Sequence, residues 1–271
     1  MDWHPRADNL NIVGSDSWLR PLYRLYEDRL VRQLDRERLP RHVGIILDGH
    51  RRYALQEGLP DYSASYRAGM HKFEEFIGWA AELAIPAVTG WVLSKENLSR
   101  PSGELEPYYE VLIDFFGRLP SLARHHDLRV RFIGSLDLLP TRLVRAAKTA
   151  EEESPEGSRR LTIALGYAGR QEIVDACRDL VQKLVSEGVA ADELMDRISA
   201  DALAAHMYTA DLPDPDLLIR TSGESRLSGF LLWQSAYAEF AFVDVYWPAF
   251  RRVDFLRELR DFSRRDRRFG Q

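Results

Sequence analysis

The sequence predicts an α/β protein built on a largely parallel β-sheet with helices on both faces. Short apolar runs, which are typical of buried strands, alternate with longer segments whose apolar residues recur at helical spacing. This alternation is the pattern of β–α–β units, in which consecutive strands run parallel. No repeat, low-complexity stretch or linker interrupts it. We therefore expect a single domain over residues 17–271, preceded by a loose N-terminal leader at residues 1–16.

The apolar runs predicted as strands are rich in Val, Ile, Leu and Phe and are followed by polar stretches. They are residues 43–47, 87–93, 128–133, 161–165, 217–220 and 240–245.

Amphipathic segments between these runs are predicted as helices. The first, residues 17–38, carries leucines at helical spacing and ends before Pro40. Residues 55–63, which include Gly58 and Pro60, are predicted to form a mobile loop. The other predicted helices are residues 66–83, 103–119, 140–152, 171–185, a short pair reaching about His206, and 253–264.

Composition excludes several classes of protein. The net charge of −5, from 37 basic and 42 acidic residues, argues against general nucleic-acid binding. Cys177 is the single cysteine, so no internal disulfide can form, and its helical context predicts a core-facing side chain. No apolar run reaches transmembrane length and no signal peptide is evident. We expect a cytoplasmic protein, which an apolar substrate could still draw into peripheral membrane contact.

The stretch HVGIILDGHRRY, residues 42–53, contains the strongest local signal. A buried strand ends at Asp48-Gly49, which places a carboxylate at the carboxyl edge of the sheet. Arg51 and Arg52 follow, and arginine is well shaped to bind phosphate oxygens. The stretch fits either a metal–phosphate site or a strand followed by a solvated basic turn.

Polar clusters also follow other predicted strands, at residues 94–100, 166–170 and 220–228. Strand ends of a parallel sheet share one edge, so these clusters should converge on one cleft. One carboxylate among several arginines fits two anionic groups and a divalent cation, and Mg²⁺ typically takes few protein ligands. The residues expected in the cleft are Asp48, Arg51, Arg52, Asn97, Arg100, Arg220 and Arg226.

Other familiar signatures are missing or incomplete. The Walker loop, GxGxxG and HExxH are absent, and residues 223–227 resemble a hydrolase elbow only until the last position. His125 and His126 lack metal-ligand spacing and are interpreted as part of a solvated turn.

The ordered motifs DGHRRYA, LSKENLSRP, GYAGRQEIVDA, IRTSGESRLSGFLLWQSAYAEFAF, WPAF and RRFG resemble the cis-prenyltransferases, which include undecaprenyl diphosphate synthase. The resemblance runs from about Pro21 to the end and is strongest to actinobacterial short-chain members that make cis-farnesyl diphosphate. It implies a six-stranded parallel sheet, a homodimer, and Mg²⁺-assisted condensation of isopentenyl diphosphate with an allylic diphosphate to give a new cis double bond.

The resemblance also implies residue roles. Asp48 and Glu239 match the magnesium ligands, and Asn97 and Ser94 match polar residues of the second motif. We assign Asp48 and Asn97 as candidate catalytic residues and Ser94 as a substrate-binding residue. Arg268 and Gly270 match a C-terminal Arg-x-Gly that reaches a neighbouring subunit's site. Residues that match the allylic diphosphate cradle are Gly49, Arg51, Arg52 and Arg100, and those that match the isopentenyl diphosphate site are Arg220, Arg226 and Ser228.

His50 is the main departure, because the family has Asn after Asp-Gly. An imidazole there could preserve condensation, slow it or redirect the cation, so we assign His50 as a candidate catalytic residue. Alternatives on the same fold are an irregular coupling enzyme or a terpene cyclase. An alternative from another class is a non-catalytic dimer partner that only supports an active subunit.

We expect a short product from a dimethylallyl or geranyl primer. The growing prenyl tail should extend between the predicted helices 66–83 and 103–119, and bulky side chains should block its further extension. The predicted chain-length residues are Val92, Leu93, Leu112, Phe115 and Phe116.

Overall fold

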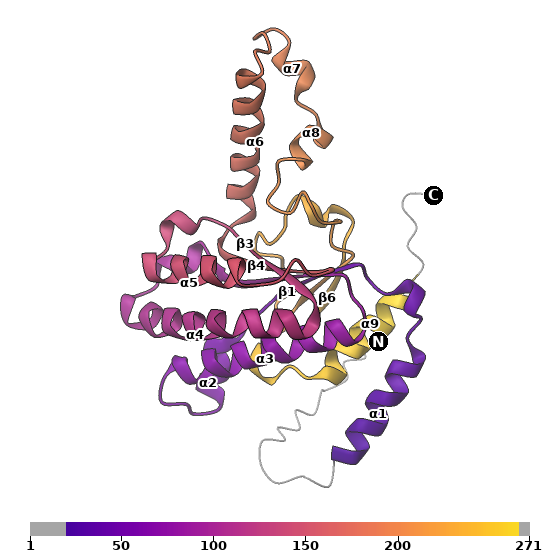
Figure 1. Cartoon of the computed structure of the whole chain (residues 1–271). Coiled ribbons are helices and arrows are strands. Elements are labelled where there is room, and N and C mark those ends of the chain that lie inside the picture. Colours follow the sequence, from indigo (N-terminus) through magenta and orange to yellow (C-terminus); the bar gives the residue numbers. More distant parts are fainter. Residues whose placement is uncertain (1–19, 266–271) are drawn as a thin grey trace, which may run out of the picture.

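The computed structural model describes residues 20–265, which form one six-stranded sheet with all neighbouring strands parallel (Figure 1). This confirms the predicted α/β class. The predicted leader, residues 1–16, lies outside the described residues. The strands, in the spatial order β3-β4-β2-β1-β5-β6, are β3 (Leu128–Ile133), β4 (Arg159–Tyr167), β2 (Ala87–Ser94), β1 (His42–Ile46), β5 (Leu217–Arg220) and β6 (Glu239–Phe242).

Alternating side chains of the central strands enter two cores. On β1, Val43 and Ile45 belong to the larger core, whereas Ile46 belongs to a smaller core on the opposite face. The same alternation places Leu217 and Leu218 of β5 in different cores. Both sheet faces are therefore covered, which is why these strands are apolar runs rather than alternating patterns.

Helices cover mainly the face of the larger core. The helices that contribute buried side chains to that core are α1 (Arg20–Gln33), α3 (Tyr62–Glu82), α4 (Ser102–His126), α5 (Thr141–Glu152) and α9 (Arg252–Arg264). The smaller core is closed instead by Phe230 and Leu231, which lie in an irregular segment.

Two helices differ from the sequence prediction. Helix α2 (His50–Gln56) forms where a basic turn and the start of a loop were expected, and α3 begins at Tyr62. Asp61 caps α3 by accepting hydrogen bonds from the backbone N–H groups of Ser63 and Ala64. The predicted loop is therefore shortened to residues 57–61. Helix α4 continues through Pro120 to His126, because its buried face packs on the core beyond the proline.

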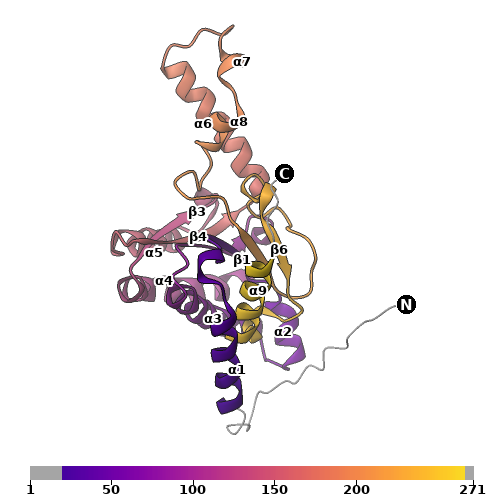
Figure 2. The same ribbon diagram turned by 90° about the vertical axis from the view of Figure 1, so that its right-hand side faces the viewer.

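Helix α6 (Gly169–Ser186) projects from the body, with α7 (Leu194–Arg197) and α8 (Ala200–Ala204) returning beside it (Figures 1 and 2). Cys177 on α6 is exposed, so the predicted core-facing position is wrong. The neighbouring Ala176 takes the buried position, because a projecting helix has a narrow packed face. Among residues 20–265, no helix is long and apolar enough to cross a membrane.

His42, at the start of β1, is a buried histidine with both ring nitrogens engaged. Nδ1 lies 2.7 Å from the Pro213 carbonyl, which can only accept, so Nδ1 carries the proton. Nε2 then accepts from the Thr89 hydroxyl at 2.8 Å. Burial lowers the pKa of His42 from 6.5 to about 4, so the imidazole is neutral at neutral pH.

We predict that His42 makes the fold sensitive to acid. Between pH 6.5 and about 4 the unfolded histidine binds a proton and the folded one does not, so stability falls as pH falls. This effect amounts to about 2–3 kcal/mol. Urea unfolding from pH 7.5 to pH 5 should show a larger loss of stability in the parent protein than in His42→Gln. Equal losses would contradict the assignment.

Candidate active site

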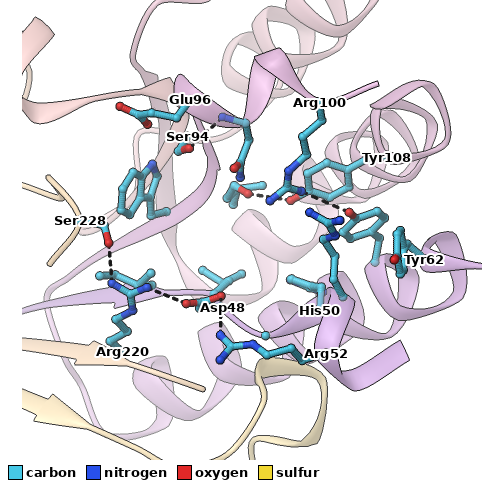
Figure 3. A pocket seen from close by; sticks show the side chains of 18 of the residues that line it. Asp48, His50, Arg52, Tyr62, Ser94, Glu96, Arg100, Tyr108, Arg220 and Ser228 are labelled. Carbon is cyan, nitrogen blue, oxygen red and sulfur yellow. Dashed lines mark hydrogen bonds and ion pairs between the residues drawn. The ribbon is translucent and has the colours of Figure 1, made fainter. Parts of the chain in front are cut away.

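A cavity of about 690 Å³ opens at the carboxyl ends of β1, β2 and β5, which are neighbours in the sheet (Figure 3). Three of the four polar clusters predicted after strands meet there, whereas residues 166–170 do not line the cavity. The predicted site residues that line it are Asp48, Gly49, His50, Arg51, Arg52, Val92, Ser94, Asn97, Arg100, Arg220 and Ser228.

The turn after β1 is held by backbone contacts that leave the Asp48 side chain free to face the cavity. The Thr221 hydroxyl accepts from the Asp48 N–H at 3.0 Å and lies 2.8 Å from its carbonyl. Gly49 has φ of 107°, and a Cβ there would stand 2.7 Å from the Tyr246 ring. Only glycine fits this turn, which begins α2 and directs its arginines to the cavity.

Asp48 lies between two arginines (Figure 3). Its Oδ2 accepts from Arg220 Nη2 at 2.7 Å, and its Oδ1 lies 3.5 Å from Arg52 Nη2. Partial burial opposes ionisation, but the hydrogen bond and charge of Arg220, with Ser222 and Arg52, lower the pKa of Asp48 overall. The carboxylate is therefore ionised at neutral pH. Arg220 also donates to the Ser228 hydroxyl at 2.7 Å.

A second cluster surrounds Glu104 in the first turn of α4. Its Oε1 accepts from the Tyr66 hydroxyl at 2.8 Å and from Arg100 Nη1 at 3.1 Å. Arg51 Nε lies 3.8 Å from the same oxygen, and its guanidinium packs over the Tyr62 ring. Glu104 was not predicted from the sequence, because Arg100 and Pro101 precede α4 and a helical ion-pair spacing does not apply to the Arg100–Glu104 pair.

Asn97 and Ser94 lie where β2 leads into a short 3-10 turn. The Asn97 backbone N–H donates to the Ser94 hydroxyl at 3.2 Å, which fixes the turn at the cavity rim. Glu96, another residue that the sequence analysis did not single out, also lines the cavity. It follows β2 directly, as Asp48 follows β1, so the strand-end rule used for Asp48 would have found it.

His50 lies at the start of α2 and packs against α3. Its Nδ1 lies 3.3 Å from the Ser65 carbonyl, and its ring fills the space left by Gly69, where a Cβ would come within 2.0 Å. Burial lowers the pKa of His50 to about 4, so the ring is neutral at neutral pH. Nδ1 must then be the donor, and the buried Nε2 is an acceptor without a protein partner. The neutral ring, with its pKa near 4, is therefore not poised to exchange a proton near neutral pH.

Several predicted residues are not brought to the cavity. Arg226 has a side chain that is 64% exposed and pairs with Glu224, which also accepts from Arg52 at 3.1 Å. Glu239 is paired in register with Leu217, at the amino end of the sheet, and contacts Arg265 at 2.8 Å. Within one chain it therefore lies at the opposite strand ends from Asp48, and its metal role stays a prediction. Arg268 and Gly270 lie outside the described residues.

The predicted chain-length residues do not all line the cavity. Only Val92 lines the cavity, and the other four are completely buried in the larger core. The apolar wall contains residues that were not predicted for it, because helical spacing alone does not show how deep a cavity reaches between two helices. These are Ile46, Leu47, Leu55, Tyr62, Tyr66, Trp91 and Tyr108.

Comparison with known proteins finds one matching family model and several similar named proteins. The Prenyltransf family model, described as undecaprenyl diphosphate synthase, matches residues 46–270. Isoprenyl transferase 1 of Corynebacterium efficiens is 49% identical over 253 residues, which cover 93% of this chain and 98% of that protein. The (2Z,6E)-farnesyl diphosphate synthase of Thermobifida fusca is 49% identical over 253 residues, covering 92% and 97% respectively.

Solved structures include the same architecture. Lavandulyl diphosphate synthase from Lavandula x intermedia, in complex with dimethylallyl diphosphate, is 33% identical and superposes with a TM-score of 0.81. The match covers 87% of this chain and all of that one, 100%. The structural similarity therefore extends over most of this chain.

Proposed function

This chain belongs to the undecaprenyl diphosphate synthase family of prenyltransferases, and on that premise we propose that it is a short-chain cis-prenyltransferase. It condenses isopentenyl diphosphate with dimethylallyl or geranyl diphosphate to a farnesyl-sized Z-prenyl diphosphate. The observation that carries the proposal is one ionised carboxylate, Asp48, placed between arginines that line a single cavity. A relative named for this product, from Thermobifida fusca, supports the product size.

The two arginine groups correspond to two diphosphate sites. Arg51, Arg52 and Arg100 would hold the allylic diphosphate, and Arg220 with Ser228 would hold isopentenyl diphosphate. The allylic carbon–oxygen bond breaks, the terminal double bond of isopentenyl diphosphate attacks the resulting cation, and loss of a C2 proton forms the new double bond. These side chains contribute by placing the two reacting carbons side by side.

Prenyl diphosphate synthases of this family generally use a divalent metal, and we propose Mg²⁺. Asp48 would hold it together with diphosphate oxygens and water, since Mg²⁺ often takes only one or two carboxylates. Among the described residues no group of three or more His, Cys, Asp or Glu forms a metal site by itself, which fits an ion shared with substrate. When bound, the ion neutralises charge on the departing diphosphate. Glu239 is not part of this proposal.

An irregular coupling is the second candidate. His50 stands where the family has Asn, and the similar lavandulyl diphosphate synthase structure contains dimethylallyl diphosphate. The experiment that decides is incubation of the protein with Mg²⁺, labelled isopentenyl diphosphate and each primer, followed by chromatography of the dephosphorylated products. A linear Z-prenol supports the main proposal, and a branched or cyclic skeleton supports the second.

We propose that the protein is a homodimer with β6 at the interface. β6 is an edge strand, and its Phe240 and Phe242 rings are stacked at 6.3 Å and are 37% and 43% exposed. The nearby Tyr237 is 77% exposed. Exposed apolar edges favour association, and a second copy fits the homodimer that the family resemblance implies.

The Asp48→Asn variant should lose about 100-fold or more in turnover with Mg²⁺, because the metal loses its carboxylate while the side-chain shape is kept. Asp211→Asn is the matched control, since it removes a carboxylate that pairs with an arginine, Arg131, and neither residue lines the cavity. Circular dichroism should show both variants folded. Near-normal turnover in Asp48→Asn would refute the site.

Replacing Arg220 by Lys should raise the KM for isopentenyl diphosphate by about tenfold, because lysine cannot reproduce a bidentate contact. Arg226→Lys should raise the same KM by less, since the Arg226 side chain is exposed and outside the cavity. Initial-rate kinetics with each substrate varied in turn would test this. A rise confined to the allylic substrate would mean that the two sites are reversed.

The double variant Phe240→Lys/Phe242→Lys should convert the dimer to a monomer in analytical ultracentrifugation, because like charges would meet across the interface. Leu138→Lys is the control, because Leu138 is 50% exposed but lies outside this surface. An unmodified protein that sediments as a monomer would refute the proposal.

A further inference from the structure

We infer that Tyr66 and Tyr108 together form the floor that sets product length, an inference that rests on the proposed function. Both tyrosines line the cavity, Tyr66 from α3 and Tyr108 from α4. Their rings face each other with centroids 4.2 Å apart and an interplanar angle of 31°. The pair therefore closes the gap between the two helices along which a prenyl tail would extend.

Tyr108 is fixed in place at both ends. Its backbone belongs to α4, and its hydroxyl donates to the Val92 carbonyl on β2 at 2.7 Å. The side chain thus spans from helix to sheet, and the residue is only 3% exposed. Because the hydroxyl already has a buried partner, the ring cannot swing aside without leaving that carbonyl unpaired.

Tyr66 joins the floor to the proposed diphosphate cradle. Its hydroxyl donates to Glu104 Oε1 at 2.8 Å and lies 3.3 Å from Arg100 Nη1. Arg100 and Tyr108 lie on the same side of the cavity (Figure 3). These contacts fix the position of the Tyr66 ring relative to the arginine that would bind the allylic diphosphate.

Below the tyrosine pair the space between α3 and α4 is filled in layers. Helical spacing puts Met70 and Leu112 one turn deeper, and Phe73 and Phe115 about 10 Å deeper, at 1.5 Å per residue. All four are completely buried in the larger core, and none lines the cavity. Removing the first layer would extend the cavity toward these residues, which are apolar and suited to a longer tail.

Phe116, one of the residues predicted from the sequence to limit product length, does not line the cavity. Its ring packs edge-on against Phe132 of β3 at 4.8 Å, beside Phe115. It is as buried as Phe115 and is separated from the cavity by the tyrosine layer. Phe116 therefore provides a matched control: it is an aromatic residue of the same helix with the same burial but without contact to the cavity.

The test compares Tyr108→Ala, Tyr108→Phe and Phe116→Ala with the unmodified protein, using labelled isopentenyl diphosphate and geranyl diphosphate. Tyr108→Ala should lengthen the main product by one or more isoprene units and lower the KM for farnesyl diphosphate as a primer. Tyr108→Phe keeps the ring and should keep the length, as should Phe116→Ala. Thermal melting identifies any variant that does not fold, and Tyr108→Leu replaces Tyr108→Ala if that variant is unfolded.

A short product from the unmodified protein and from the folded Tyr108 variant, Tyr108→Ala or Tyr108→Leu in its place, would overturn the inference while leaving the proposed function intact. Lengthening by Phe116→Ala, with no change at Tyr108, would also overturn it and restore the floor predicted from the sequence. If the unmodified protein forms no prenyl diphosphate from any primer, the proposed function fails and the inference fails with it.

Discussion

The ion pair between Asp48 and Arg220 is the contact on which the cavity depends. It joins the carboxyl ends of β1 and β5 at 2.7 Å, where the parallel sheet brings these two strand ends together. The Arg220 side chain is only 7% exposed, so its charge needs partners. Asp48 and Ser228 supply them, and in doing so they hold an ionised carboxylate and a buried guanidinium facing the same space.

Each arginine that lines the cavity contacts a carboxylate. Arg100 and Arg51 share Glu104, and Arg52 lies between Asp48 and Glu224. These carboxylates offset the repulsion among neighbouring guanidiniums and hold them in one arrangement before substrate arrives. A diphosphate then meets donors that are already oriented, which lowers the ordering cost of binding.

The cavity divides into a charged part and an apolar part, and His50 lies near their boundary. Its neutral ring packs against Tyr66 with centroids 5.4 Å apart, and Gly69 makes room for it. The same Tyr66 takes part in the Glu104 cluster. Tyr66 thus connects the residues proposed to bind diphosphate with those proposed to bind the prenyl tail, because α2, α3 and α4 meet at this point.

The sequence by itself determined the α/β class and the strands, because hydrophobic periodicity is a local property of the chain. It also determined the convergence of Asp48, Arg51, Arg52, Arg100 and Arg220, because parallel strands place their carboxyl ends at one edge of the sheet. Tertiary structure alone decided the exposure of Cys177, the place of Glu239 at the far end of the sheet, and the depth at which Tyr66 and Tyr108 close the cavity. These features depend on strand register and on how side chains from separate helices pack, and no short stretch of sequence encodes either.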